Sequence, residues 1–444
     1  MAGETHGLPV AELGKTEAGN YFVANYPPFS LWTPERVGEA TDRLQTRGDP
    51  SNPLGLYVHI PFCRKRCHFC YFKVYTDRNK DDIRAYLDAV IAEVERLGRT
   101  PFVEGRTLDF VYFGGGTPSY LSTEQLRYLF DGLRGAVSWE GAREIAFECE
   151  PGTLNEKKVH AIAQLGVTRL SLGIENFDDD VLEINNRAHR SRQVHDACAW
   201  APSAGFEQIN IDLIAGMVGE TPENWRRCIE RALEMAPDVV TIYQMEVPFN
   251  TTIYRDMREQ GREIAPVADW PTKRQWVADA FDAFEAAGYH VASAYTVVKD
   301  PARTKFVYRD ALWDGADMLG TGVSSFGLLG PVHYQNRHRI EQYVEEVERG
   351  ASAIYRAMTM TDEERMIRQF VLQMKLGRLS RRPFIERFGV DVFDRFADTL
   401  QAYAQSGLLS IEGDVLTLSR EGLLQVDRLL HAFFLPEHRE VRYA

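Results

Sequence analysis

The sequence lacks long hydrophobic runs and any sign of a secretory leader. No apolar run reaches the length of about 18 residues that a membrane-spanning helix requires. The first twenty residues, MAGETHGLPVAELGKTEAGN, are polar and lack the apolar core of a signal peptide. These absences predict a cytoplasmic protein with no membrane contact.

Positive charge and cysteine are also scarce. The chain has 51 Lys and Arg against 64 Asp and Glu, which gives a formal net charge of −13. Because phosphate backbones and anionic lipids attract positive surfaces, we expect no nucleic-acid partner and no membrane partner. Six cysteines in a cytoplasmic chain do not indicate a disulfide framework. Three of them lie within eight residues, and this clustering requires a chemical explanation.

The pattern of apolar residues predicts an α/β fold. The 444 residues, 44% of them hydrophobic, suffice for a large core and more than one domain. Short apolar runs alternate with segments of helical spacing. The predicted strands are 56–60, 108–115, 144–151, 167–175, 208–216 and 238–246, and the predicted helices between them are 81–98, 122–137, 155–166, 192–205 and 223–236. This alternation predicts a parallel sheet, curled as a partial (β/α)6 TIM-like barrel with its site at the C-terminal strand ends, or else an open doubly wound sheet.

The rest of the chain divides into three predicted parts. Residues 1–54 form a loop-rich N-terminal extension, residues 55–350 the barrel, and residues 351–444 a C-terminal domain. Residues 288–299 are a candidate for one further strand near the barrel. The C-terminal domain combines helices with a short strand pair around Gly413, which is the outline of a small α-rich winged-helix-like unit. The acidic charge of the chain favours a lid or docking role for this unit over DNA binding.

The clustered cysteines predict an iron–sulfur site. Cys63, Cys67 and Cys70 have the spacing CxxxCxxC and follow directly on the first predicted strand, so they lie on a loop that can wrap around one metal centre. Three cysteines ligate three irons of a 4Fe–4S cluster and leave one iron open. A zinc site would need a fourth ligand, for which His68 is the candidate. The remaining cysteines, Cys149, Cys198 and Cys228, fit strand and helix patterns as small core residues.

With these motifs the sequence resembles the radical S-adenosylmethionine (SAM) superfamily, and within it the HemN-like branch typified by oxygen-independent coproporphyrinogen III oxidase. The resemblance starts at YVHIPFC and extends along nearly the whole chain from about residue 50. Its further motifs are FGGGTPS at 113–119, FECEP at 147–151, RLSLGIENF at 169–177, NRAH at 186–189, NIDLIAG at 210–216 and DMLGTGVSSFG at 317–327.

The resemblance implies a set of residues that bind the cluster and SAM. Tyr57 and Phe69 would shield the cluster and contact adenine. The residues that the resemblance places around the rest of SAM are Gly114, Gly115, Gly116, Thr117, Glu148, Glu175, Arg187 and Asp212. Among them, Arg187 could hold the methionine carboxylate, and Glu175 departs from the glutamine usual in the oxidase. Tyr243, Gln244 and Glu246, at the end of the sixth predicted strand, are candidates for the substrate side, with Glu175, Tyr243 and Gln244 as candidate catalytic residues.

The resemblance also implies the chemistry. An electron from the cluster cleaves SAM to methionine and a 5′-deoxyadenosyl radical, which abstracts hydrogen from an inert carbon of a small-molecule substrate. By family analogy the electron comes from a donor such as flavodoxin or ferredoxin.

Two departures from family patterns bear on the reaction subtype. Phe72 stands where the oxidase has a further cysteine, and VYRDALWDGADMLG lacks the His-Asn pair of the haem chaperones. By elimination we expect a two-SAM methyl or methylene transfer to an sp2 carbon, as in C-methylation or cyclopropanation. The alternatives are oxidative decarboxylation of coproporphyrinogen III, and a haem chaperone or anaerobic haem-degrading relative.

Overall fold

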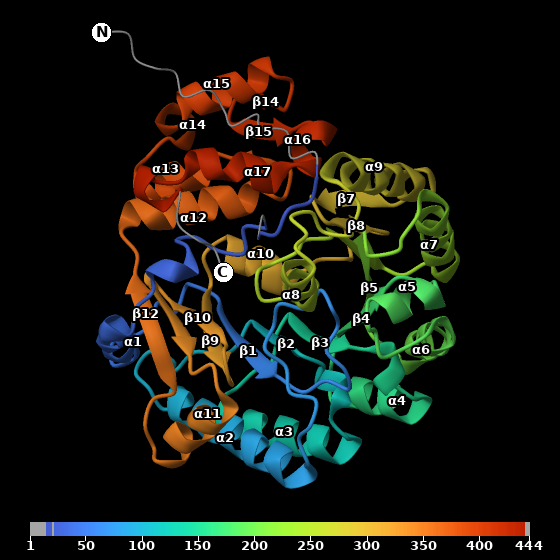
Figure 1. Ribbon diagram of the computed structural model, residues 1–444. Helices are drawn as coiled ribbons and strands as arrows, with labels where there is room; N and C mark the ends of the chain where they lie inside the picture. The colour runs from blue at the N-terminus through green and yellow to red at the C-terminus, as the bar shows by residue number, and fades with distance from the viewer. Residues whose placement is uncertain (1–14, 20–21, 440–444) are drawn as a thin grey trace.

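The computed structural model of the protein describes residues 15–19 and 22–439, and most of the described strands belong to one large sheet (Figure 1). The strands of this sheet are β1 (Leu54–Ile60), β2 (Phe110–Gly115), β3 (Glu144–Cys149), β4 (Arg169–Glu175), β5 (Gln208–Ala215), β6 (Val239–Gln244), β7 (His290–Ser293), β8 (Thr296–Val298), β9 (Asp317–Thr321), β10 (Phe326–Leu329), β11 (Val332–Asn336) and β12 (Ile354–Thr359). Within the described ranges they form twelve strands in the order β12-β11-β10-β9-β1-β2-β3-β4-β5-β6-β8-β7.

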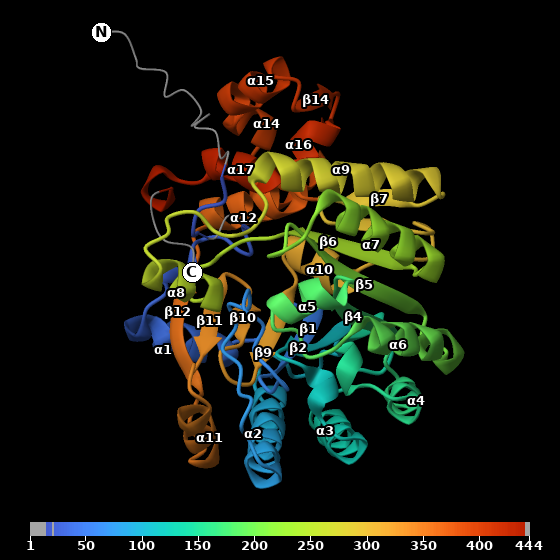
Figure 2. The same cartoon turned by 45° about the vertical axis from the view of Figure 1, so that its right-hand side comes forward.

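The predicted barrel is confirmed. Strands β1 to β6 are neighbours in chain order and pair in parallel. The helices that follow the strands are α2 (Lys80–Gly98), α3 (Thr123–Ala136), α4 (Glu156–Gln164), α5 (Asp179–Ile184), α6 (Ser191–Ala204), α7 (Pro222–Met235), α8 (Thr252–Glu259) and α9 (Trp270–Ala286). Helices α2, α3, α4, α6 and α7 cover the outer side of the curved sheet (Figure 2). The site that we predicted therefore lies where the C-terminal ends of the parallel strands meet.

Both edges of the barrel carry strands beyond the six. Residues 288–299 form the β7–β8 hairpin, and β8 pairs antiparallel to β6, as the candidate strand there suggested. On the other edge β9 pairs in parallel with β1, and β10 to β12 continue the sheet in antiparallel pairs. Residues 317–327 stood out in the sequence only as a family motif, and this extension of the sheet was not predicted.

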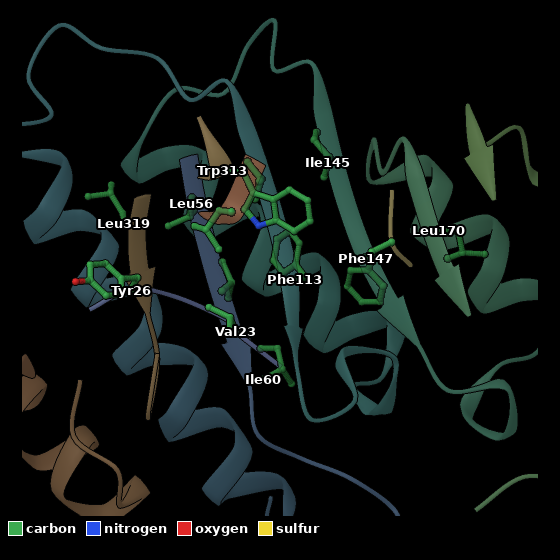
Figure 3. Packing of buried hydrophobic residues seen from close by; sticks show 14 of the residues in the cluster. Val23, Tyr26, Leu56, Ile60, Phe113, Ile145, Phe147, Leu170, Trp313 and Leu319 are labelled. Atoms are coloured by element: carbon green, nitrogen blue, oxygen red, sulfur yellow. The ribbon is translucent and has the colours of Figure 1, made fainter. Parts of the chain in front are cut away.

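A large hydrophobic cluster supports most of the sheet. Phe113 on β2 and Phe147 on β3 point to the same side with ring centroids 5.6 Å apart, and Phe113 stacks on Phe130 of α3 at 4.5 Å (Figure 3). The buried cluster also includes Leu56 and Leu170 of the neighbouring strands. Parallel strands with both faces covered are apolar almost throughout, which is why β1 to β5 could be predicted from short apolar runs.

The C-terminal residues add a small helical unit with its own sheet. Its elements are α12 (Asp362–Met374), β13 (Arg378–Ser380), α13 (Arg382–Phe388), α14 (Val392–Arg395), α15 (Ala397–Gln405), β14 (Leu409–Glu412), β15 (Val415–Leu418), α16 (Arg420–Leu424) and α17 (Val426–Leu430). The predicted strand pair is the β14–β15 hairpin, with Gly413 in its turn at φ 58°. Strand β12 lies in the large sheet although it follows residue 350, so the division at 350/351 stays a prediction.

The described part of the N-terminal extension lies against the barrel and the small unit. Gly19 donates its backbone N–H to the Val247 carbonyl just after β6 (2.9 Å), and the Val23 N–H bonds Asp427 of α17 (2.9 Å). Helix α1 (Val37–Leu44) packs on β11 and β12. Two more helices, α10 (Val307–Trp313) and α11 (Ile340–Glu348), flank β9 to β12 in the chain. Residues 1–14 of the predicted extension lie outside the described residues. Over the described ranges, every helix is too short or too polar to span a bilayer.

Candidate active site

The three clustered cysteines lie on a loop that begins where β1 ends. The end of β2 packs directly on this loop: the Gly116 N–H donates to the Ile60 carbonyl (2.8 Å) and the Thr117 N–H to the Phe62 carbonyl (2.9 Å). The Thr117 hydroxyl also donates to the Cys63 sulfur (3.2 Å). The glycine-rich segment at the end of β2 is therefore in direct contact with the cysteine loop.

This close packing explains why the segment consists of glycines. A Cβ atom at Gly115 would lie 2.4 Å from the His59 ring, and Gly115 has φ +107°, which side chains rarely adopt. A Cβ at Gly116 would lie 2.7 Å from the Ile60 carbonyl oxygen. At Gly114 it would lie 3.0 Å from the Glu148 carboxyl group. The three glycines allow the backbone to approach both the cysteine loop and a buried acid.

Loops from other strand ends hold the rest of the cysteine loop. The Asn186 amide donates to the Arg66 carbonyl (2.8 Å), and the Asn250 amide donates to the Tyr71 carbonyl (2.6 Å). The His68 ring donates from Nδ1 to the Ile184 carbonyl (3.0 Å). The loop is thus fixed by hydrogen bonds from segments that follow β4 and β6, in addition to those from β2.

The surroundings of the cysteines disfavour a thiolate that lacks a positive partner. Burial raises the pKa of the Cys63 thiol to about 12 and that of Cys70 to about 11, and the neighbouring cysteines add to both shifts. Arg187 donates to the Cys67 sulfur (3.3 Å). Buried thiolates need positive partners, and iron would supply them at this loop.

The zinc alternative finds no support. In residues 15–19 and 22–439, no three His, Cys, Asp or Glu side chains are grouped so that they could hold one metal ion. His68 is engaged with the Ile184 carbonyl. A 4Fe–4S cluster does not need such convergence, because each cysteine ligates a different iron. Cys63, Cys67 and Cys70 are therefore the residues that would hold the cluster.

Three buried acids lie at the neighbouring strand ends. Glu148 on β3 accepts bonds from the Tyr112 hydroxyl (2.6 Å) and the Gly115 N–H (3.2 Å), and burial raises its pKa to about 7. Asp212 on β5 accepts from the Asn210 amide (2.8 Å), and burial raises its pKa as well. Burial also raises the pKa of Glu175 to about 7. Since the hydrogen-bond donors to Glu148 and Asp212 are neutral, a cationic ligand would stabilise both carboxylates.

Arg187 is the cation of this site. It lies on the loop after α5, 8% exposed, and reaches both the Cys67 sulfur and the Glu175 carboxylate, the latter at 3.5 Å. Its Nε–H is buried and has no hydrogen-bond partner in the described structure. The predicted SAM contacts Glu148, Arg187 and Asp212 thus lie on neighbouring segments, and Glu175 joins them through its ion pair.

Aromatic side chains surround the acids. Tyr57, Tyr112 and Tyr308 stack, with Tyr112 and Tyr308 at 4.2 Å between ring centroids. The Tyr57 hydroxyl bonds His59 Nδ1 (3.1 Å). Phe69 packs instead against a separate apolar cluster around the end of β6. Tyr308 was not among the predicted residues, because nothing in its sequence neighbourhood indicates that α10 returns to β2.

The candidate substrate-side residues have different surroundings. Tyr243 is 41% exposed and stacks on Tyr295 with ring centroids 6.4 Å apart. Gln244 donates its amide to the Leu424 carbonyl of α16 (3.0 Å), so it connects the barrel to the C-terminal unit. The catalytic role of Glu175, Tyr243 and Gln244 stays a prediction.

Comparison with known proteins identifies the family. The model of the radical SAM superfamily matches residues 57–232, and that of the HemN C-terminal domain matches residues 360–424. The fold, the cysteine loop and these matches define a radical SAM enzyme, with the 4Fe–4S cluster and SAM that the superfamily implies. The chain belongs to the HemN-like family of this superfamily.

The similar proteins carry two kinds of name. Oxygen-independent coproporphyrinogen III oxidase of Escherichia coli K12 is 26% identical over 95% of this chain and 94% of its own length. Heme chaperone HemW of Mycobacterium tuberculosis H37Rv is 30% identical over 86% of this chain and 95% of its own length. The solved structure of coproporphyrinogen III oxidase (HemN) from E. coli has the same fold, with a TM-score of 0.80, 24% identity, and coverage of 94% of this chain and 99% of that one. The methyl-transfer subtype gains no support from these relatives.

Proposed function

We propose that this enzyme performs the reaction class of oxygen-independent coproporphyrinogen III oxidase: radical-initiated oxidative decarboxylation of propionate side chains on a porphyrinogen. The observation that carries the proposal is the extent of the likeness. The E. coli oxidase corresponds to 95% of this chain and to 94% of its own length. The acid-rich site at the cysteine loop supports the SAM-dependent half of the reaction.

The charges of the site match those of SAM. SAM carries a sulfonium and an ammonium, which would pair with Glu148 and Asp212, and a carboxylate, which would pair with Arg187. When bound at an open iron of the cluster, SAM supplies a radical that takes hydrogen from a carbon. The protein would orient SAM through these ion pairs. In turn, the cationic groups of SAM would keep Glu148 and Asp212 ionised.

Phe72 is the departure that the proposal must accommodate. It is 39% exposed and its ring lies 4.4 Å from that of Tyr71, so the position of the further oxidase cysteine holds an exposed aromatic pair. We infer that decarboxylation in this chain does not use a thiol there. In Phe72→Cys, product formation should therefore not rise.

The test is an anaerobic assay on the reconstituted enzyme. Protein, SAM, dithionite and coproporphyrinogen III are combined, and 5′-deoxyadenosine and porphyrinogen products are measured by mass spectrometry. The expected product has lost CO₂ and two hydrogens per propionate. Cys63→Ala should abolish both signals, and the matched control Cys198→Ala, which changes a half-buried cysteine of α6, should retain them.

Other outcomes would replace the proposal. Accumulation of S-adenosylhomocysteine with a methylated product would favour the two-SAM methyl transfer. Tight haem binding without SAM cleavage would favour the chaperone, the second candidate, which the 30% identity to HemW supports. SAM cleavage with an unchanged porphyrinogen would exclude this substrate.

A further inference from the structure

Arg187 makes two contacts that bear on the electron chemistry of the cysteine loop. Nη1–H donates to the Cys67 sulfur at 3.3 Å, and Nη2 lies 3.5 Å from Glu175 Oε1. The two side chains are only 10% and 13% exposed. A single buried guanidinium thus connects a cluster-ligand sulfur to a buried carboxylate, and solvent screens neither contact strongly.

The backbone on both sides of this pair is specially shaped. Glu175 has φ 66°, in the left-handed region that a residue with a side chain rarely adopts, and the β4–β5 register shifts between Gly173 and Glu175. Asn176 holds the turn in place, since its amide donates to Glu220 at 2.7 Å and it is fully buried. Asn186, next to Arg187, has φ 57°. Such strain persists where the surrounding structure fixes it, commonly at functional sites.

Gly173 completes the arrangement. Arg187 Nη2 donates to the Gly173 carbonyl, and a Cβ on Gly173 would lie 3.1 Å from Glu175 Oε1 and 3.5 Å from Arg187 Nη2. A side chain at this position would press on both partners of the ion pair. The end of β4, the turn at Asn176 and the absence of a side chain at Gly173 together place Glu175 against Arg187 rather than on the surface.

We propose that Glu175 acts through Arg187 to lower the reduction potential of the cluster held on Cys67. Hydrogen bonds to ligand sulfurs and nearby charge set the potential of iron–sulfur clusters. A guanidinium beside the sulfur stabilises the reduced, more negative cluster and so raises its potential. The negative charge of Glu175 partly compensates the positive charge of Arg187. The reduction potential is therefore lower, and the reduced cluster is a stronger one-electron donor. The glutamine usual at this position in the oxidase carries no such charge.

The experiment is a redox titration followed by electron paramagnetic resonance on the cluster-loaded full chain, without substrate. Glu175→Gln should raise the midpoint potential, and Arg187→Gln should lower it. Asp212→Asn is the matched control, because it removes a buried carboxylate from the same site without a contact to Arg187. Its shift should be less than half that of Glu175→Gln. Iron content per chain is measured for every variant.

A double mutant separates an action through Arg187 from direct charge repulsion. In the Arg187→Gln background, Glu175→Gln should lose most of its effect. An equal shift in both backgrounds, or equal shifts for Glu175→Gln and Asp212→Asn, would overturn the proposal. If Arg187→Gln fails to hold iron, equal shifts of the midpoint potential in Glu175→Gln and Asp212→Asn still overturn the proposal.

The inference rests on the proposed function only in requiring the cluster. Because the potential is measured without porphyrinogen, a failed decarboxylation assay leaves it standing. An unchanged potential in Glu175→Gln would refute the inference and leave the decarboxylation intact.

Discussion

Protonation of Glu148 should control SAM binding. Its pKa is raised by burial to about 7, and its hydrogen-bond donors, the Tyr112 hydroxyl and the Gly115 N–H, are neutral. A bound cation favours the ionised carboxylate and lowers its pKa. Binding SAM therefore releases a proton from Glu148 wherever the free protein holds one, and the affinity must fall as the pH falls below about 7.

The magnitude follows from the shift. A return of the pKa from about 7 to the usual 4.5 corresponds to about 3 kcal/mol of interaction with the cation. At pH 6 roughly one Glu148 in ten is ionised in the free protein, and at pH 8 most are. The SAM affinity should therefore fall about tenfold from pH 8 to pH 6 through this residue alone.

The assay is equilibrium dialysis of SAM against the cluster-loaded chain at pH values from 6 to 8. Glu148→Gln should bind SAM more weakly than the native chain at pH 8. It should also lose the part of the fall in affinity between pH 8 and pH 6 that protonation of Glu148 causes. Glu93→Gln is the matched control, because burial raises the pKa of Glu93 to about 7 in a network with Gly322, Asn336 and Tyr343 outside the site. An unchanged affinity of the native chain between pH 8 and pH 6, or an effect of Glu93→Gln equal to that of Glu148→Gln, would refute the reasoning.

Three further changes test other parts of the structure. Gly115→Ala should release iron on dilution and lower the free energy of unfolding by roughly 1–3 kcal/mol or more, since its Cβ would meet the His59 ring at 2.4 Å; iron assay and urea unfolding measure this. Burial lowers the pKa of Lys273 to about 7, so above pH 7 the unfolded chain binds more protons than the folded chain does. The free energy of unfolding should therefore rise from pH 7 to pH 9. Lys273→Met should remove this rise, as measured by urea unfolding. Tyr308→Leu should cost about 1 kcal/mol in the same assay, because it removes the stack on Tyr112.

The sequence was informative where the fold depends on local patterns. Strands β1 to β5 are buried on both faces, so their apolar runs stand out between amphipathic helices. The cysteine spacing after β1 indicated the loop that would hold the cluster. Strand β9 could not be found in this way, because the GTGVSSFG segment around it has the composition of a loop. Its pairing with β1 joins residues more than 250 positions apart, as Leu54 with Asp317.

The site was predictable to the extent that family motifs carry it. Family motifs assigned Glu148, Arg187 and Asp212 to one site, and the structure places them on neighbouring segments. Their roles stay predictions. The sequence could not indicate that Gln244 bonds the Leu424 carbonyl or that Tyr308 stacks on Tyr112. Both contacts depend on where α16 and α10 pack against the barrel. Local sequence patterns do not indicate the packing of helices so distant in the chain.

The buried ionisable groups of the site indicate which charges a ligand must carry. Buried thiols, buried carboxylates and a buried guanidinium each cost free energy unless an opposite charge pairs with them. In this chain the three kinds of group lie close together: the cysteines on the loop after β1, Glu148 and Asp212 on β3 and β5, and Arg187 on the loop after α5. Under the proposed function, iron would complement the first, a sulfonium and an ammonium the second, and a carboxylate the third. A neutral ligand would satisfy none of them, so we expect the recognition of SAM to rest on charges that the protein alone leaves only partly compensated.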